Sequence, residues 1–126
     1  MTPLTDQHIA AVMQAYVDAM SGDDVEKVLT LYADDAVVED PVGSESFKGI
    51  DAIRDFYAEA IAAVASMELE GNPRVRGNLG ACAMVAHPKG AEDVMVAETL
   101  DVMSFNDEGK ITSMIAYWGD SNIRVI

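Results

Sequence analysis

The sequence predicts an α+β fold in which three N-terminal helices pack on one face of a curved, mostly antiparallel sheet. Up to about residue 65, apolar residues recur at the spacing of helical faces. From residue 67 onward the apolar period falls to about two, and Gly, Pro and Asn clusters separate the segments, which is typical of strands joined by turns. Helices followed by strands are the order of an α+β domain. The 126 residues contain no linker or repeat, so we expect one domain, residues 1–126.

The three predicted helices are amphipathic and carry polar residues that can cap them. They are expected at residues 6–20, 24–33 and 51–65. Thr5 can serve as N-cap of the first helix, and Asp23 or Asp24 as N-cap of the second. Their apolar stripes are expected to face the sheet.

Each predicted helix places one tyrosine within its apolar stripe. These are Tyr16, Tyr32 and Tyr57. A buried tyrosine needs a partner for its hydroxyl, and a backbone carbonyl would suffice for each. Three inward-facing hydroxyls in so small a domain also favour a shared hydrogen-bond network.

A short strand, residues 36–40, is expected before the third helix, and the other strands follow it. They are predicted at Met67–Glu70, Arg74–Val75, Leu79–His87, Glu92–Phe105 and Lys110–Trp118. The last three turns, at 77–78, 88–90 and 106–109, separate consecutive strands, which indicates antiparallel hairpins or meanders.

Asp40 ends the 36–40 strand and is followed by Pro41. Side chains alternate along a strand, so Asp40 shares its face with the apolar residues Ala36 and Val38. A carboxylate in this position either points back to water at the strand end or acts as a base in an apolar pocket. The stretch alone leaves both interpretations open.

Asp101 lies in the middle of a predicted strand, between Thr99 and Met103 on one face. Aspartate is disfavoured in such a position. In an apolar environment, desolvation would favour the neutral carboxyl, which can donate a hydrogen bond. The face could instead be hydrated, or an arginine from elsewhere could pair with Asp101. In the last strand, Met114 and Trp118 share a face that can form the wall of an apolar pocket.

Composition and motifs exclude several classes of function. The net charge of −14 argues against nucleic acids and anionic membrane surfaces as partners. There is no phosphate-binding glycine loop and no nucleophile elbow, and neither histidine has metal-ligand spacing, so no metal or cofactor is expected. No signal peptide and no apolar run of ~20 residues are present, so we expect a cytoplasmic protein.

The acids and tyrosines that remain point to proton transfer without a cofactor. One carboxylate would act as the base, and neutral hydroxyl or carboxyl donors would stabilise an oxyanion.

The order of several short motifs resembles the steroid Δ-isomerases, or ketosteroid isomerases, of the nuclear-transport-factor-like superfamily. The motifs are Tyr16-Val17, Gly22-Asp23, Leu31-Tyr32-Ala33-Asp34-Asp35, Val38-Glu39-Asp40-Pro41-Val42-Gly43, Asp55-Phe56-Tyr57, Leu100-Asp101-Val102-Met103 and Ala116-Tyr117-Trp118. The resemblance spans roughly residues 10–124. It implies a cone-shaped, cystatin-like α+β fold, a homodimer, and a deep apolar pocket for a 3-oxo-Δ5-steroid.

The resemblance also implies roles for individual residues. Asp40 would carry a proton from carbon 4 to carbon 6 of the steroid. Tyr16 and a protonated Asp101 would donate hydrogen bonds to the oxyanion of the dienolate intermediate. Tyr57 and Tyr32 would extend the hydrogen-bond chain from Tyr16. The substrate-binding residues expected on this basis are Trp118, Met103, Met114, Met84, Phe56, Val38 and Met20.

One strand departs from the family pattern. Residues 79–87 lack the phenylalanines expected there, and small residues with Met84 would leave a roomier and more pliable pocket. This departure concerns the choice of steroid rather than the chemistry. Two alternatives remain: another enzyme of this fold (a cyclase, dehydratase or epoxide hydrolase) or a non-catalytic carrier of apolar ligands.

Overall fold

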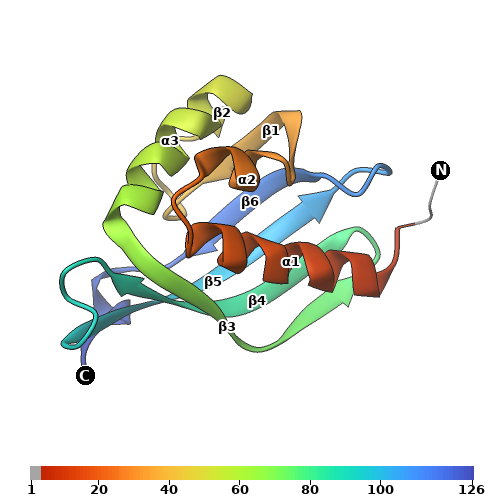
Figure 1. Ribbon diagram of the computed structural model, residues 1–126. Helices are drawn as coiled ribbons and strands as arrows, with labels where there is room; N and C mark the ends of the chain where they lie inside the picture. Colours follow the sequence, from red (N-terminus) through yellow and green to blue (C-terminus); the bar gives the residue numbers. More distant parts are fainter. Residues whose placement is uncertain (1–3) are drawn as a thin grey trace.

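The computed structural model describes residues 4–126, which form helices packed on a single open sheet (Figure 1). The helices are α1 (Asp6–Met20), α2 (Val25–Leu29) and α3 (Ile50–Ala63), with a 3-10 turn η1 (Asp120–Asn122) near the C-terminus. The strands are β1 (Tyr32–Glu39), β2 (Phe47–Lys48), β3 (Val64–Arg76), β4 (Leu79–Pro88), β5 (Met95–Phe105), β6 (Ile111–Tyr117) and β7 (Ile123–Val125).

The sheet is mostly antiparallel and curved, as the sequence predicts. Its strand order is β2-β1-β6-β5-β4-β3, and β7 pairs with β5. Only β1 and β6 run parallel within the described part of the chain. In Figure 1, α1 crosses the sheet in front of β3 and β4, and α3 lies over the β1 end. The predicted α+β architecture is therefore confirmed.

Helix α1 lies directly on β4 because a glycine permits the close approach. An added Cβ at Gly80 would lie 2.8 Å from a side-chain carbon of Ile9. Ile9 and Met13 are fully buried on this face of the helix. The predicted N-cap is present, since the Thr5 hydroxyl accepts a hydrogen bond of 3.0 Å from the backbone N–H of His8.

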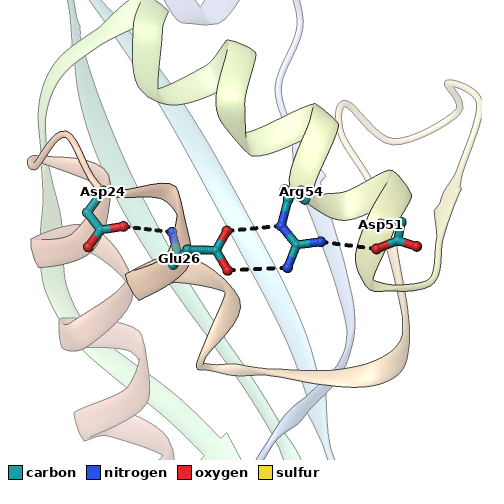
Figure 2. Close-up of polar contacts among 4 residues, drawn as sticks. All are labelled: Asp24, Glu26, Asp51 and Arg54. Atoms are coloured by element: carbon teal, nitrogen blue, oxygen red, sulfur yellow. Dashed lines mark hydrogen bonds and ion pairs between the residues drawn. The ribbon is translucent and has the colours of Figure 1, made fainter.

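An exposed ion-pair cluster joins α2 to α3 (Figure 2). Asp24 caps α2 by accepting a hydrogen bond from the backbone N–H of Glu26. The guanidinium of Arg54 donates to both carboxylate oxygens of Glu26, at 2.9 and 3.2 Å, and to Asp51 at 3.0 Å. This cluster keeps Arg54 on the outside of the molecule.

The predicted helix at 24–33 is wrong in its second half. Helix α2 ends at Leu29, and Tyr32 begins strand β1, where it pairs with Ile111 of β6. The backbone N–H of Ile111 donates a hydrogen bond of 2.8 Å to the carbonyl of Leu31. The segment after Leu29 therefore pairs with strand β6 and does not continue the helix. Strand β1 is consequently longer than the predicted 36–40 segment.

Other boundaries also differ from the prediction. The segments 67–70 and 74–75 are one strand, β3, with a register shift against β4 between Glu70 and Arg74. A bulge therefore accommodates the glycine and proline that were expected to form a turn. Strand β7 was not expected, because its three exposed residues carry almost no periodic signal.

The core lies between the helices and the sheet and is almost entirely apolar. Among residues 4–126, Asp101 is the only aspartate, glutamate, lysine or arginine that is buried, with 2% of its surface exposed. None of the described helices combines the length and the apolar character needed to cross a membrane.

Candidate active site

A cavity of about 250 Å³ opens between the helices and the sheet. Its lining residues come from α1, α3 and the strands, and most are apolar. They are Tyr16, Met20, Asp40, Phe56, Tyr57, Ala60, Val64, Met67, Ala86, Ala97, Thr99, Asp101 and Trp118. The polar exceptions bring together the three residues that the sequence singled out: Asp40, Tyr16 and Asp101.

Asp40 follows the last residue of β1 and is half-buried at the cavity wall. Ala36 and Val38, which share its face of the strand, are fully buried, so the predicted alternation is confirmed. The indole Nε1–H of Trp118 donates a hydrogen bond of 2.7 Å to Asp40 Oδ1. Burial raises the pKa of the Asp40 carboxyl above its usual value, and the Trp118 hydrogen bond opposes this shift by stabilising the charged form.

Asp101 lies on β5 and is buried against the same cavity. The pKa of the Asp101 carboxyl is raised to about 7, chiefly by desolvation and also by the negative charge of Asp40, while a hydrogen bond from Thr99 partly opposes the rise. The Thr99 hydroxyl donates this bond to Asp101 Oδ1 at 3.0 Å. The two cavity carboxyls therefore differ in environment, since Asp101 is the more deeply buried and the more easily protonated.

No arginine pairs with Asp101 among residues 4–126, which removes one of the alternatives for this residue. Arg54 is held by Glu26 and Asp51 on the surface, as Figure 2 shows. Arg124 pairs with Glu98. The carboxyl of Asp101 thus lacks the cationic partner that would keep it charged.

The three tyrosines form a buried hydrogen-bonded chain. The hydroxyls of Tyr16 and Tyr57 lie 3.0 Å apart, and those of Tyr32 and Tyr57 lie 2.5 Å apart. Burial raises the pKa of all three well above the usual value, so the hydroxyls stay neutral donors. Tyr16 and Tyr57 line the cavity, whereas Tyr32 lies behind them on β1.

The expected substrate-binding residues divide into two groups. Trp118, Phe56 and Met20 line the cavity. The other four are fully buried in the core and are not among the lining residues: Val38, Met84, Met103 and Met114. All four belong to the apolar core between the helices and the sheet.

Six lining residues were not expected to form the wall. They are Ala60, Val64, Met67, Ala86, Ala97 and Thr99. Met67 pairs with Ala86, and Ala86 pairs with Ala97, so three adjacent strands contribute one row of side chains. Alternation on β5 places Ala97 and Thr99 on the face of Asp101, but the register with β3 and β4 is not visible in the sequence.

No group of three or more histidine, cysteine, aspartate or glutamate side chains suited to a metal ion is present within residues 4–126. The two cavity carboxyls have tryptophan and threonine as their hydrogen-bonding partners.

Comparison with known proteins places this architecture in a family. Residues 13–114 match the SnoaL-like domain. The chain belongs to the SnoaL-like family. A steroid Delta-isomerase from Nocardioides simplex is 36% identical over 117 residues, which cover 93% of this chain and 94% of the relative. The resemblance to steroid isomerases of the nuclear-transport-factor-like superfamily is thereby confirmed.

Solved structures of this SnoaL-like fold include enzymes of another activity. An epoxide hydrolase/cyclase-like enzyme of pyran ring formation in the polyether salinomycin superposes with a TM-score of 0.86 at 25% sequence identity. The superposition covers 96% of this chain and 98% of the other. The fold is therefore shared by enzymes that act on different molecules, and residues of the cavity must distinguish the activities.

Proposed function

We propose that this SnoaL-like protein is a steroid Δ-isomerase that converts 3-oxo-Δ5-steroids to conjugated 3-oxo-Δ4-steroids. One observation carries the proposal: a half-buried carboxyl, a fully buried carboxyl and a neutral tyrosine hydroxyl line the same apolar cavity. The pair of carboxyls gives one group for proton abstraction and another for hydrogen-bond donation. The steroid isomerase relative supports the same activity.

In this proposal Asp40 is the base that serves both half-reactions. Its carboxylate removes a proton from carbon 4, the electrons of that C–H bond form a dienolate, and the 3-oxo oxygen becomes an oxyanion. The same carboxyl returns the proton to carbon 6, so the double bond moves from the 5,6 to the 4,5 position with no net change in atoms. The raised pKa of Asp40 makes it a stronger base than an exposed aspartate.

Tyr16 and protonated Asp101 would donate the two hydrogen bonds to the oxyanion. Both groups are buried, so water competes little for the developing charge, and such donors are effective in a dry site. Tyr57 and Tyr32 support Tyr16, because a chain of hydroxyls polarises its members. Asp101 must remain neutral for this role, which its desolvation favours.

The remainder of the cavity suits a rigid apolar ligand. It is lined by alanines, two methionines, a valine and Phe56, whose side chains offer contact area without hydrogen-bond donors. The homodimeric state implied by the resemblance belongs to the same proposal, and light scattering of the purified protein measures it directly.

The test is conversion of 5-androstene-3,17-dione to its conjugated 4-ene isomer, followed by the increase in ultraviolet absorbance. We expect rapid turnover without added metal or cofactor. An absence of turnover at micromolar enzyme contradicts the proposal.

The structural relative raises a second candidate, an epoxide hydrolase or cyclase activity. Epoxide hydrolases of this fold use an Asp-Arg-Asp arrangement. In this chain Arg54 is engaged by Glu26 and Asp51 outside the cavity, and no arginine lines the cavity walls described. An apolar-ligand carrier is the remaining alternative, and loss of deuterium from a labelled carbon 4 separates an isomerase from a carrier.

A further inference from the structure

We propose that Thr99 is a positioning residue for Asp101: its hydroxyl fixes the orientation of the carboxyl and determines which carboxyl oxygen carries the proton. The kinetic consequence of this inference rests on the proposed isomerase function. Its structural and titration consequences do not.

The geometry begins with strand β5, where Thr99 and Asp101 are two residues apart and so lie on the same face. Both line the cavity, and the Thr99 hydroxyl donates to Asp101 Oδ1 at 3.0 Å. Within residues 4–126, no other hydrogen bond reaches this carboxyl. A threonine side chain is also restricted about its first torsion, which limits the directions that its hydroxyl can take.

This contact makes the two oxygens of Asp101 unequal. Oδ1 accepts the proton of the Thr99 hydroxyl, and the carbonyl oxygen of a neutral carboxyl is the acceptor in such a bond. The carboxyl proton is then on Oδ2, which becomes the oxygen able to donate to a ligand in the cavity. Without Thr99, either oxygen could carry the proton and the carboxyl could rotate.

The hydrogen bond also acts on the protonation of Asp101. It stabilises the charged form and so lowers the pKa of the carboxyl, against the larger effect of desolvation. The charged group that faces Asp101 is Asp40, at the end of β1. The other titratable groups around it are neutral: the tyrosine hydroxyls of α1, α3 and β1 and the thiol of Cys82 on β4, whose own pKa is raised by burial. Arg74 of β3 acts on the Cys82 thiol.

The experiment compares Thr99→Val, which removes the hydroxyl at nearly constant shape, with Thr99→Ser, which keeps it. Thr112→Val is the matched control, because Thr112 is a half-buried threonine of β6 that does not line the cavity. Carbon-13 NMR of protein labelled at the aspartate carboxyls follows the titration, with the Asp101 signal assigned by its loss in Asp101→Asn. Thr99→Ala repeats the test if the valine variant does not fold.

We expect the Asp101 midpoint to move to higher pH in Thr99→Val and to stay near that of the native protein in Thr99→Ser and Thr112→Val. In the isomerase assay, Thr99→Val should lower kcat by about tenfold with little change in KM, because a misplaced donor weakens only the transition state. Serine should restore most of the rate.

An unchanged Asp101 midpoint in both Thr99→Val and Thr99→Ala overturns the inference, even if their activity falls, since Thr99 would then act directly on the substrate or only in packing. The titration needs no turnover. A native protein without isomerase activity would therefore contradict the proposed function and still leave the role of Thr99 open to measurement by the titration.

Discussion

The indole Nε1–H of Trp118 donates a 2.7 Å hydrogen bond to the carboxylate of Asp40 and thereby joins the ends of two neighbouring strands. Asp40 follows β1 and Trp118 follows β6. Because these strands pair in parallel, their C-terminal ends, and with them both residues, lie side by side. The bond engages only Oδ1 of the carboxylate. If Asp40 is the proposed base, Trp118 would hold its carboxylate in place through Oδ1 and leave Oδ2 for proton transfer.

Replacing Trp118 by phenylalanine should shift the pH dependence of the reaction. The Trp118 hydrogen bond stabilises charged Asp40, so its loss raises the pKa of Asp40 further. The acid limb of the kcat/KM profile should then move to higher pH, because more alkaline solution is needed to ionise the base. Tyr117→Phe, at the exposed preceding residue, is the control. An acid limb that stays in place would show that the hydrogen bond has no effect on the base.

Replacing Asp40 by asparagine should remove nearly all isomerase activity. An amide cannot accept the carbon-4 proton, and general-base catalysis is worth up to about 10⁴-fold. Tyr16→Phe and Asp101→Ala should lose less, about 10²-fold each, because the second oxyanion donor remains. Steady-state rates with 5-androstene-3,17-dione measure all three. Glu39→Gln is the matched control, since Glu39 neighbours Asp40 but does not line the cavity. Native-like activity of Asp40→Asn would exclude Asp40 as the base.

The sequence was most informative where one strand or helix decides the position of a residue. Alternation grouped Asp40 with Ala36 and Val38 on β1 and Asp101 with Thr99 and Met103 on β5, and the structure shows that both faces point inward. Helical spacing placed Tyr16 and Tyr57 on inward faces. Helical spacing gave the wrong secondary structure for Tyr32, because pairing with β6 outweighed the local helical preference. Tyr32 nevertheless joins the tyrosine chain, since the same inward direction is available from a strand.

The cavity wall could not be predicted in the same way. Which residues form it depends on the register of β3, β4 and β5 and on where α1 and α3 leave the sheet uncovered. Met84 and Ala86 share one face of β4, yet only Ala86 lines the cavity. Single-strand periodicity carries no information on this difference.

Replacing Asp101 by asparagine should make the stability of the protein less dependent on pH. The folded-state pKa of Asp101 is raised to about 7, so the folded state binds this proton more tightly than the unfolded state. Stability from Asp101 is therefore fully present below about pH 4 and is lost as the pH rises to about 7. The loss is on the order of 4 kcal/mol.

Urea denaturation between pH 4 and pH 8 measures this effect as the difference between native protein and Asp101→Asn, which cancels the contributions of other groups. Asparagine keeps the shape of the side chain and remains neutral. The free energy of unfolding of the variant should therefore increase relative to that of the native protein as the pH rises. Parallel pH profiles of the two proteins would contradict a raised pKa at Asp101.

Replacing Ala97 by phenylalanine should restrict the cavity to smaller ligands. Ala97 lies four residues before Asp101 on the same face of β5, about 13 Å along the strand, in the row that it forms with Ala86 and Met67. A phenyl ring there should fill the part of the cavity away from Asp101. The KM for the four-ring steroid should rise at least about tenfold through the steric conflict, whereas a two-ring enone that mimics rings A and B should still be isomerised.

The two substrates distinguish a blocked cavity from a damaged site. A blocked cavity leaves turnover of the two-ring compound intact, whereas a damaged site does not. Leu100→Phe is the matched control, because Leu100 is exposed on the opposite face of the same strand. Unchanged KM for the steroid in Ala97→Phe would mean that the substrate does not extend along β5 from Asp101. Loss of turnover with both substrates would instead mean that the phenyl ring disturbs the carboxyls themselves.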